Sequence, residues 1–209
     1  MIRPDRGPIN LIIDLLQTRL HISEQSSPGA CLLMTWRNDC NRPDIFYRFH
    51  RRPDEKIFLA PYAIDNEFFA DQAMRCRPRR EELRAVCGIP DGVFTFLFVG
   101  KLEQKKHPLD LLHALEALAP EERERAHLLV AGDGPLMKVC QQYVTDRHLP
   151  VTFAGFVNQS RLPEVYAAAD VLVLPSDAGE TWGLVVNEAM ASGRPAVSSS
   201  TSKRRRSTP

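Results

Sequence analysis

Short apolar runs and segments of helical periodicity alternate along the chain from about residue 90 onward. The apolar runs are bounded by polar loops that contain glycine or proline, as buried strands are. The runs that predict strands are Phe94–Val99, His127–Ala131, Val151–Ala154 and Val171–Leu174, with a further strand starting at Pro195–Val197. Helical periodicity predicts helices over Arg79–Val86, Pro108–Leu118, Leu136–Arg147, Arg161–Ala169 and Leu184–Ala191.

The composition of these strands predicts a parallel sheet that is covered on both faces. A strand with one wet face alternates apolar and polar residues, whereas these strands are apolar nearly throughout. Since a helix follows each strand, right-handed crossovers are expected, and the class is doubly wound α/β. Ligands of such sheets bind outside the carboxyl ends of the strands. The loops expected at that edge are Gly100–His107, Gly132–Pro135, Gly155–Ser160 and Pro175–Trp182.

The pattern before residue 79 is weaker. Asn10–Leu20 has the spacing of an amphipathic helix, and Lys56–Ala60 predicts a short strand that ends at Pro61. Residues 65–69, which include Asp65 and two phenylalanines, are expected to form a turn. The residues before Lys56 do not have the pattern of a self-contained domain.

Composition and charge exclude several classes of protein. The 209 residues are 44% hydrophobic and 25% charged, which are ordinary values for a globular chain. The formal net charge of +1 argues against a general nucleic-acid or anionic-membrane surface. The five cysteines are odd in number and lack metal-ligand spacing, so free thiols in a reducing compartment are expected. No run reaches the roughly 18 apolar residues of a membrane span, and no signal-peptide pattern starts the chain.

Lysines follow the first predicted strand of the regular region. Lys101, Lys105 and Lys106 lie where that strand ends and a helix begins, so their ammonium groups and the helix N-terminus could together hold a diphosphate. The alternative is a solvated lysine cluster. The next such loop, Gly132–Pro135, either brings its backbone close to a ligand or serves only as a tight strand-to-helix turn.

Two carboxylates flank the start of the last predicted helix. Glu180 lies in the loop and Glu188 lies eight positions later in the helix. The first-turn N–H groups of Gly183, Leu184 and Val185 could face an anion, while Glu180 could reach a neutral polyol beside it. Glu188 stands among apolar residues and needs partners, which sugar hydroxyls could supply. The alternative is that Glu188 faces solvent or pairs with an arginine.

Together these segments resemble the C-terminal half of retaining glycosyltransferases of the GT-B fold, family 4 (group 1). The resemblance covers roughly Lys56 to Val197. The segments that carry it are VGKLEQKKHP, HLLVAGDGPL, VTFAGFV, LPEVYAAADVLVLPS and ETWGLVVNEAMASGRPAV, the last of which holds an E-x7-E pattern. The segment KIFLAPYAIDNEFF is similar to the crossing between the two domains of that family.

The resemblance implies a role for each matching residue. Lys101 and Lys106 would grip the diphosphate of the donor, Glu188 would bind the nucleotide ribose, and Glu180 would face the transferred sugar as the catalytic residue. It also implies a Rossmann-like sheet and sugar transfer with retention from a UDP- or GDP-sugar. Electrostatic stabilisation of the departing diphosphate would be the main catalytic effect.

The resemblance implies further donor contacts. The backbone from Gly183 to Val185 would bind phosphate, and Phe156 and Val157 match positions near the base. No metal and no cofactor are expected, because the lysines and the helix dipole can neutralise the diphosphate.

The same resemblance suggests an incomplete fold. Residues 1–55 are expected to be a remnant of the N-terminal, acceptor-side domain and the interdomain region. Residues 56–198 are expected to form the nucleotide-sugar-binding domain, and residues 199–209 a disordered basic tail. We therefore predict a glycosyltransferase fragment. The alternative is a degenerate fragment that binds nucleotide sugars without catalysis.

The expected partner is a nucleotide-diphospho-sugar. The basic tetrapeptide Lys203–Arg206 is a weak footprint on a near-neutral chain, so no nucleic-acid partner is expected. The expected location is the cytoplasm, and peripheral membrane association stays open.

Overall fold

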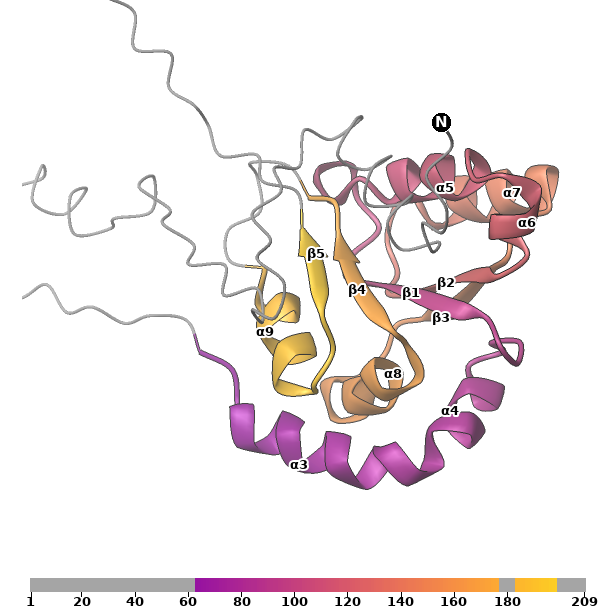
Figure 1. Ribbon diagram of the computed structural model, residues 1–209. Coiled ribbons are helices and arrows are strands. Elements are labelled where there is room, and N and C mark those ends of the chain that lie inside the picture. The colour runs from indigo at the N-terminus through magenta and orange to yellow at the C-terminus, as the bar shows by residue number, and fades with distance from the viewer. Residues whose placement is uncertain (1–62, 177–182, 199–209) are drawn as a thin grey trace, which may run out of the picture.

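A five-stranded parallel sheet forms the centre of the molecule in the computed structural model, which describes residues 63–176 and 183–198 (Figure 1). The strand order is β3-β2-β1-β4-β5, and every pair of neighbours is parallel. Chain order reverses between β1 and β4, so the sheet is doubly wound and Rossmann-like, as predicted. The strands are β1 Phe94–Val99, β2 Ala126–Ala131, β3 Val151–Gly155, β4 Val171–Leu174 and β5 Ala196–Ser198.

Helices cover both faces of the sheet (Figure 1). One layer packs around the first core cluster and consists of α5 Pro108–Glu116, α6 Pro120–Arg123 and α7 Met137–Arg147. The other layer packs around the second core cluster and consists of α3 Asn66–Cys76, α4 Arg80–Val86, α8 Leu162–Ala168 and α9 Leu184–Ala191. Three short 3-10 turns join these elements: η2 Arg77–Arg79, η3 Gln104–Lys106 and η4 Gln159–Arg161.

Burial on both faces of the sheet explains why the strands could be predicted from the sequence. Each residue of β2 and β4 is buried, and five of the six residues of β1 are buried. Alternate side chains of one strand enter different cores: Phe96 and Phe98 join the first cluster, and Leu97 joins the second. An apolar residue is therefore needed at every position. The predicted strands and helices from Phe94 onward have the observed type and end within about two residues of the observed bounds.

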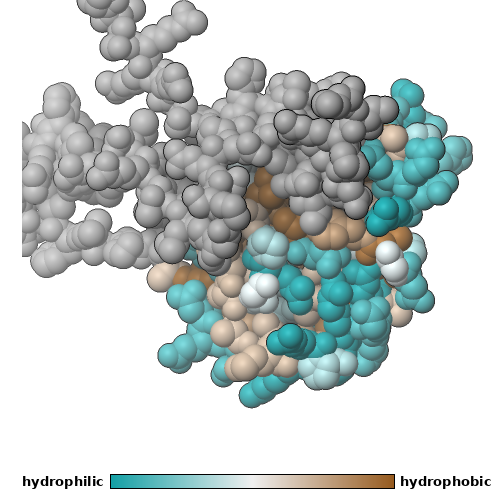
Figure 2. All heavy atoms as spheres, viewed as in Figure 1, coloured by the Kyte–Doolittle hydropathy of each residue, from teal (hydrophilic) through white to brown (hydrophobic). Residues whose placement is uncertain are grey.

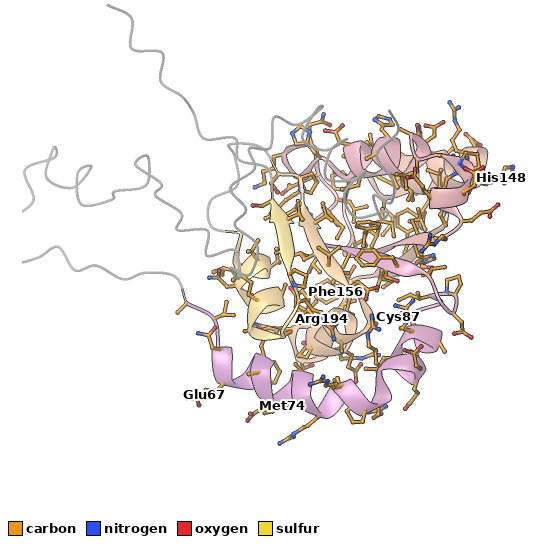
Figure 3. All side chains as sticks on the ribbon, viewed as in Figure 1. Glu67, Met74, Cys87, His148, Phe156 and Arg194 are labelled. Carbon is orange, nitrogen blue, oxygen red and sulfur yellow. The ribbon has the colours of Figure 1, made fainter. Side chains whose placement is uncertain are left out.

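The turn predicted at residues 65–69 is wrong, because these residues begin α3. The Asp65 side chain accepts a hydrogen bond from the Phe68 N–H at 2.9 Å and so caps the helix. Phe69 is buried against Tyr166, with ring centroids 6.1 Å apart. Met74, on the opposite face, is 67% exposed and points away from the sheet (Figure 3). The local sequence contains the capping residue and the two phenylalanines, but it does not contain the surface that buries Phe69.

A buried ionic network ties α4 to the amino ends of β1 and β4. Arg84 is 3% exposed and donates to the carbonyl oxygens of Val93 at 2.7 Å and Ala168 at 3.1 Å. Asp170 lies 3.7 Å from Arg84 and accepts hydrogen bonds from the Thr95 N–H and from the Arg80 guanidinium. The charges are satisfied within the protein, so this edge of the sheet serves packing.

The exposed side of the α3–α8 layer is mainly hydrophilic, with paler patches between polar residues (Figure 2). In the described ranges, no helix combines the length and the apolar character that crossing a bilayer demands. Cys76, Cys87 and Cys140 are free thiols, as expected, while Cys31 and Cys40 lie outside the described residues. The strand predicted at Lys56–Ala60 also lies outside them.

Candidate functional site

The candidate site lies where the carboxyl ends of β1 and β4 meet. These strands are neighbours in the sheet, with Phe96 opposite Val171 and Leu97 opposite Leu172. The connection after β1 leads to the helices on one face, and the connection after β4 leads to α9 on the other. The chain therefore leaves these neighbouring strands toward opposite faces of the sheet. Such a place is the topological switch point of a doubly wound sheet, where ligands of this fold class bind.

The loop after β1 carries the predicted lysines. Lys101 follows Gly100 directly, and its Nζ lies 4.0 Å from Oε2 of Glu103. The other carboxylate oxygen of Glu103, Oε1, lies 3.4 Å from Lys105 Nζ. Lys106 ends η3, and its side chain passes close to Gly100, since a Cβ built there would lie 4.0 Å from the Lys106 Cε. Glu103 was not singled out in the sequence. Exposed ion pairs of this kind are worth at most about 1 kcal/mol, so a diphosphate could replace Glu103 as the partner of Lys101.

The loop after β2 holds the lysine loop in place. Gly132 has a φ of 151°, and a Cβ added there would lie 1.8 Å from the carbonyl oxygen of Gly100. A Cβ on Gly134 would lie 2.5 Å from the carbonyl oxygen of Leu102, and the Leu102 N–H donates to the Asp133 carbonyl oxygen at 3.0 Å. Of the two interpretations of this glycine pair, the structural one is sufficient. The glycines allow two backbones to touch, and that contact shapes the loop that carries Lys101.

The loop after β4 leads to the amino end of α9. Gly183 is the N-cap residue with a φ of 55°, and its carbonyl oxygen accepts from the Val186 N–H at 2.8 Å. The following N–H groups, of Leu184 and Val185, belong to the first turn and have no acceptor within the helix. This helix end therefore carries N–H groups and a partial positive charge at the carboxyl edge, and Gly183 caps the helix rather than belonging to its first turn.

Glu188 lies one turn further along α9 and is 7% exposed. The alternative of solvent exposure is wrong, and among the described residues the partner of Glu188 is a tyrosine rather than an arginine. One carboxylate oxygen, Oε2, accepts a hydrogen bond from the Tyr166 hydroxyl at 2.8 Å, and that hydroxyl lies 3.4 Å from the Val185 carbonyl oxygen. Since side chains of a helix lean toward its amino end, the Glu188 carboxylate lies beside the first turn of α9.

Burial and hydrogen bonding act in opposite directions on this carboxyl group. Burial raises the pKa of Glu188, and the hydrogen bond from Tyr166 lowers it, with burial the larger effect. Burial and the neighbouring Glu188 both raise the pKa of Tyr166, so the phenol stays neutral and acts as the donor. Tyr166 was not singled out in the sequence, where it stands 22 residues before Glu188 with nothing to mark it as a polar partner.

The remaining predicted site residues differ in their exposure and in whether the structure describes them. Phe156 follows β3 and is 79% exposed, so its ring is available to a ligand, and it is labelled in Figure 3. The next residue, Val157, packs against the second core cluster. Glu180 lies outside the described residues. Over the described part of the chain, no three His, Cys, Asp or Glu side chains gather as metal ligands do.

A comparison with protein families identifies residues 79–206, more than half of the chain, as matching the model of glycosyl transferases group 1. The chain belongs to this family. The matched region includes all five strands and α9, so the family and the sheet geometry describe the same part of the molecule.

Relatives with curated names are also glycosyltransferases. The chain is 40% identical over 121 residues to an uncharacterized glycosyltransferase of Methanocaldococcus jannaschii, which matches 56% of this chain and 30% of that protein. It is 32% identical over 161 residues to a D-inositol 3-phosphate glycosyltransferase of Corynebacterium diphtheriae, with coverage of 74% and 36%. This group 1 chain therefore spans about a third of the length of these relatives.

Solved glycosyltransferase structures share the fold. The structure of WaaG, a glycosyltransferase involved in lipopolysaccharide biosynthesis, superposes with a TM-score of 0.60 at 24% identity, over 75% of this chain and 41% of WaaG. Anabaena HepE in complex with UDP and glucose gives a TM-score of 0.51 at 24% identity, over 65% of this chain and 36% of HepE. The expected architecture of the GT-B donor half is thereby confirmed at the level of the fold.

Proposed function

We propose that this chain contributes the donor-binding half of a retaining glycosyltransferase, which transfers a sugar from a nucleotide-diphospho-sugar to an acceptor. The observation that carries the proposal is the meeting of two cationic features at one switch point. The Lys101–Lys106 loop follows β1, and the amino end of α9 follows β4, the neighbour of β1 in the sheet. A diphosphate between them would be neutralised by ammonium groups on one side and by N–H groups on the other.

The proposed arrangement orders the donor along the sheet edge. Glu188, beside the first turn of α9, would accept hydrogen bonds from the ribose hydroxyls. Phe156, at the carboxyl end of β3, would contact the base together with the Val157 backbone. Glu180 lies outside the described residues, and its assignment to the transferred sugar rests on its place in the E-x7-E pattern.

The chemistry proposed for this half is stabilisation of a leaving group. As the bond to the anomeric carbon breaks, negative charge grows on the diphosphate and positive charge on the sugar ring. Lys101, Lys106 and the α9 dipole favour the first charge, and the loop that carries the lysines is held by backbone contacts, so little movement is needed there. HepE has been solved in complex with UDP and glucose, which supports a nucleotide-sugar donor for this chain. The titrations described next compare a UDP-sugar with a GDP-sugar.

Calorimetric titration of the 209-residue chain with UDP-glucose and with GDP-mannose tests the proposal. Lys106→Ala should weaken binding by about tenfold or more, since hydrogen bonds to charged groups are worth about 1.5–3 kcal/mol. Lys105→Ala is the matched control, because Lys105 pairs with Glu103 and is not assigned to the donor. A folded wild-type chain that binds neither donor at millimolar concentration would refute the proposal. Binding with no detectable transfer would favour the non-catalytic alternative.

A further inference from the structure

A buried hydrogen bond joins α8 to α9 behind the candidate site. Tyr166 is 0% exposed, and its hydroxyl lies 2.8 Å from Oε2 of Glu188. The ring is held edge-on to Phe69, with an interplanar angle of 71°. A tyrosine packed on every side cannot follow a carboxylate that moves, so the carboxylate is fixed with respect to α8.

The direction of the hydrogen bond follows from the titration of the two groups. The pKa of Tyr166 is raised by burial, so its proton stays on the phenol throughout the neutral range. Glu188 is then the acceptor through one oxygen, and a carboxylate has a second oxygen with further lone pairs. The hydroxyl that holds this oxygen also lies 3.4 Å from the Val185 carbonyl oxygen, so the carboxylate lies toward the amino end of α9, where the donor is proposed to bind.

We propose that Tyr166 is a positioning residue for the donor site, whose hydroxyl holds one oxygen of Glu188 so that the other is presented to hydroxyl groups of the bound nucleotide sugar. This inference rests on the proposed function. It adds that the ribose contact depends on a residue that the donor never touches.

The same hydrogen bond favours the charged form of Glu188. Burial favours the protonated carboxyl, which would be a poorer acceptor, and Tyr166 opposes that effect. The side chains that α3 and β4 contribute to this core, such as Phe69 and Leu172, are apolar. Among the described residues, Tyr166 is the titratable neighbour with a resolved influence on the Glu188 pKa. Its removal is therefore expected to raise that pKa.

The test is the pH dependence of donor binding by Tyr166→Phe. UDP-glucose and GDP-mannose serve as probes, because a diphosphate esterified at both ends keeps its charge between pH 5 and 8. Wild-type binding should weaken as the pH falls through the pKa of Glu188. In Tyr166→Phe the midpoint of this loss should move up by about one pH unit, which corresponds to about tenfold weaker binding below the midpoint.

Tyr143→Phe is the matched control. The Tyr143 hydroxyl donates to an Oε of Glu116, so the variant removes a similar tyrosine–glutamate hydrogen bond in the opposite helical layer. It should leave the pH profile of binding unchanged. Glu188→Gln should bind weakly at every pH, because its amide does not titrate. If Tyr166→Phe does not fold, 3,5-difluorotyrosine at position 166 keeps the packing and strengthens the donor, and the midpoint should then move down.

The outcomes separate the inference from the function on which it rests. If the wild-type chain binds a donor and the Tyr166→Phe profile superimposes on the wild-type profile, the positioning role is refuted while the proposed function stands. If Tyr143→Phe shifts the midpoint equally, the effect is a general loss of stability and the positioning role is again refuted. If the wild-type chain binds neither donor, both proposals fall together.

Discussion

Protonation of His127 is expected to destabilise the fold as the pH falls from 6.5 to about 4. His127 is the second residue of β2 and is 5% exposed. Its Nε2 lies 3.0 Å from the Thr152 Oγ1, and the Thr152 hydroxyl donates to the Gly88 carbonyl oxygen at 3.2 Å. Because that hydroxyl has a single proton, the Thr152 oxygen accepts from the Nε2–H of a neutral imidazole.

The size of the effect follows from the two pKa values. Burial, assisted by the positive charge of Arg84, lowers the pKa of His127 from 6.5 to about 4. Below pH 6.5 the unfolded chain binds a proton that the folded chain refuses until about pH 4, so stability is fully present above 6.5 and is lost between these values. At about 1.4 kcal/mol per pH unit, the whole window corresponds to about 3 kcal/mol.

Urea denaturation followed by far-UV circular dichroism at pH 7.5 and 4.5 measures this loss. The informative quantity is the difference between wild type and His127→Gln, because the contributions of all other titrating groups cancel in it. The glutamine amide can still donate to Thr152 but cannot take up a proton. The variant should lose about 2.5 kcal/mol less than wild type between the two pH values. Equal pH dependence in the two proteins would refute the reasoning.

Two substitutions test the backbone contact and the buried ionic network. In Gly132→Ala the added methyl would lie 1.8 Å from the Gly100 carbonyl oxygen, so this variant should destabilise the fold by more than about 3 kcal/mol and weaken donor binding. Gly92→Ala is the control, because a Cβ there meets no atom within 4 Å and should cost only about 1–2 kcal/mol of backbone strain. Thermal and urea unfolding compare them, and equal losses would contradict the contact. Asp170→Asn should lower the free energy of unfolding by about 3–5 kcal/mol, because the buried charge of Arg84 loses its partner. Glu82→Gln, which removes an exposed ion pair with Arg79, should lower it by under about 1 kcal/mol. A similar cost for both in urea unfolding would show that Arg84 does not need its counter-charge.

The regular region from Phe94 to Ser198 was predictable because its strands are buried on both faces. Full burial demands uninterrupted apolar runs, and such runs stand out in a sequence. The adjacency of β1 and β4 was not predicted, because hydrophobic periodicity does not fix the order of strands in the sheet. Family motifs then marked Lys101, Lys106 and Glu188 as candidates, although their roles remain proposals.

Prediction from local sequence patterns failed where the residue that determines the structure is distant in the sequence. Residues 65–69 read as a turn because the chain near them does not contain Tyr166, which buries Phe69. The short helix α6, Pro120–Arg123, was not predicted, since a single turn of four residues leaves no periodicity to detect. The purpose of Gly132 was ambiguous for a similar reason, because the backbone it touches belongs to another loop.

The sequence by itself determined the class of fold, the order of strands and helices, and the residue types at the carboxyl edge. Hydrophobic periodicity is a local property, and each of these features depends on it. Only the tertiary structure decided what Glu188 contacts, because a carboxylate among apolar neighbours has several ways to be satisfied. The packing of α8 against α9 selects Tyr166, and a hydrogen bond between two buried side chains depends on where their helices meet in space.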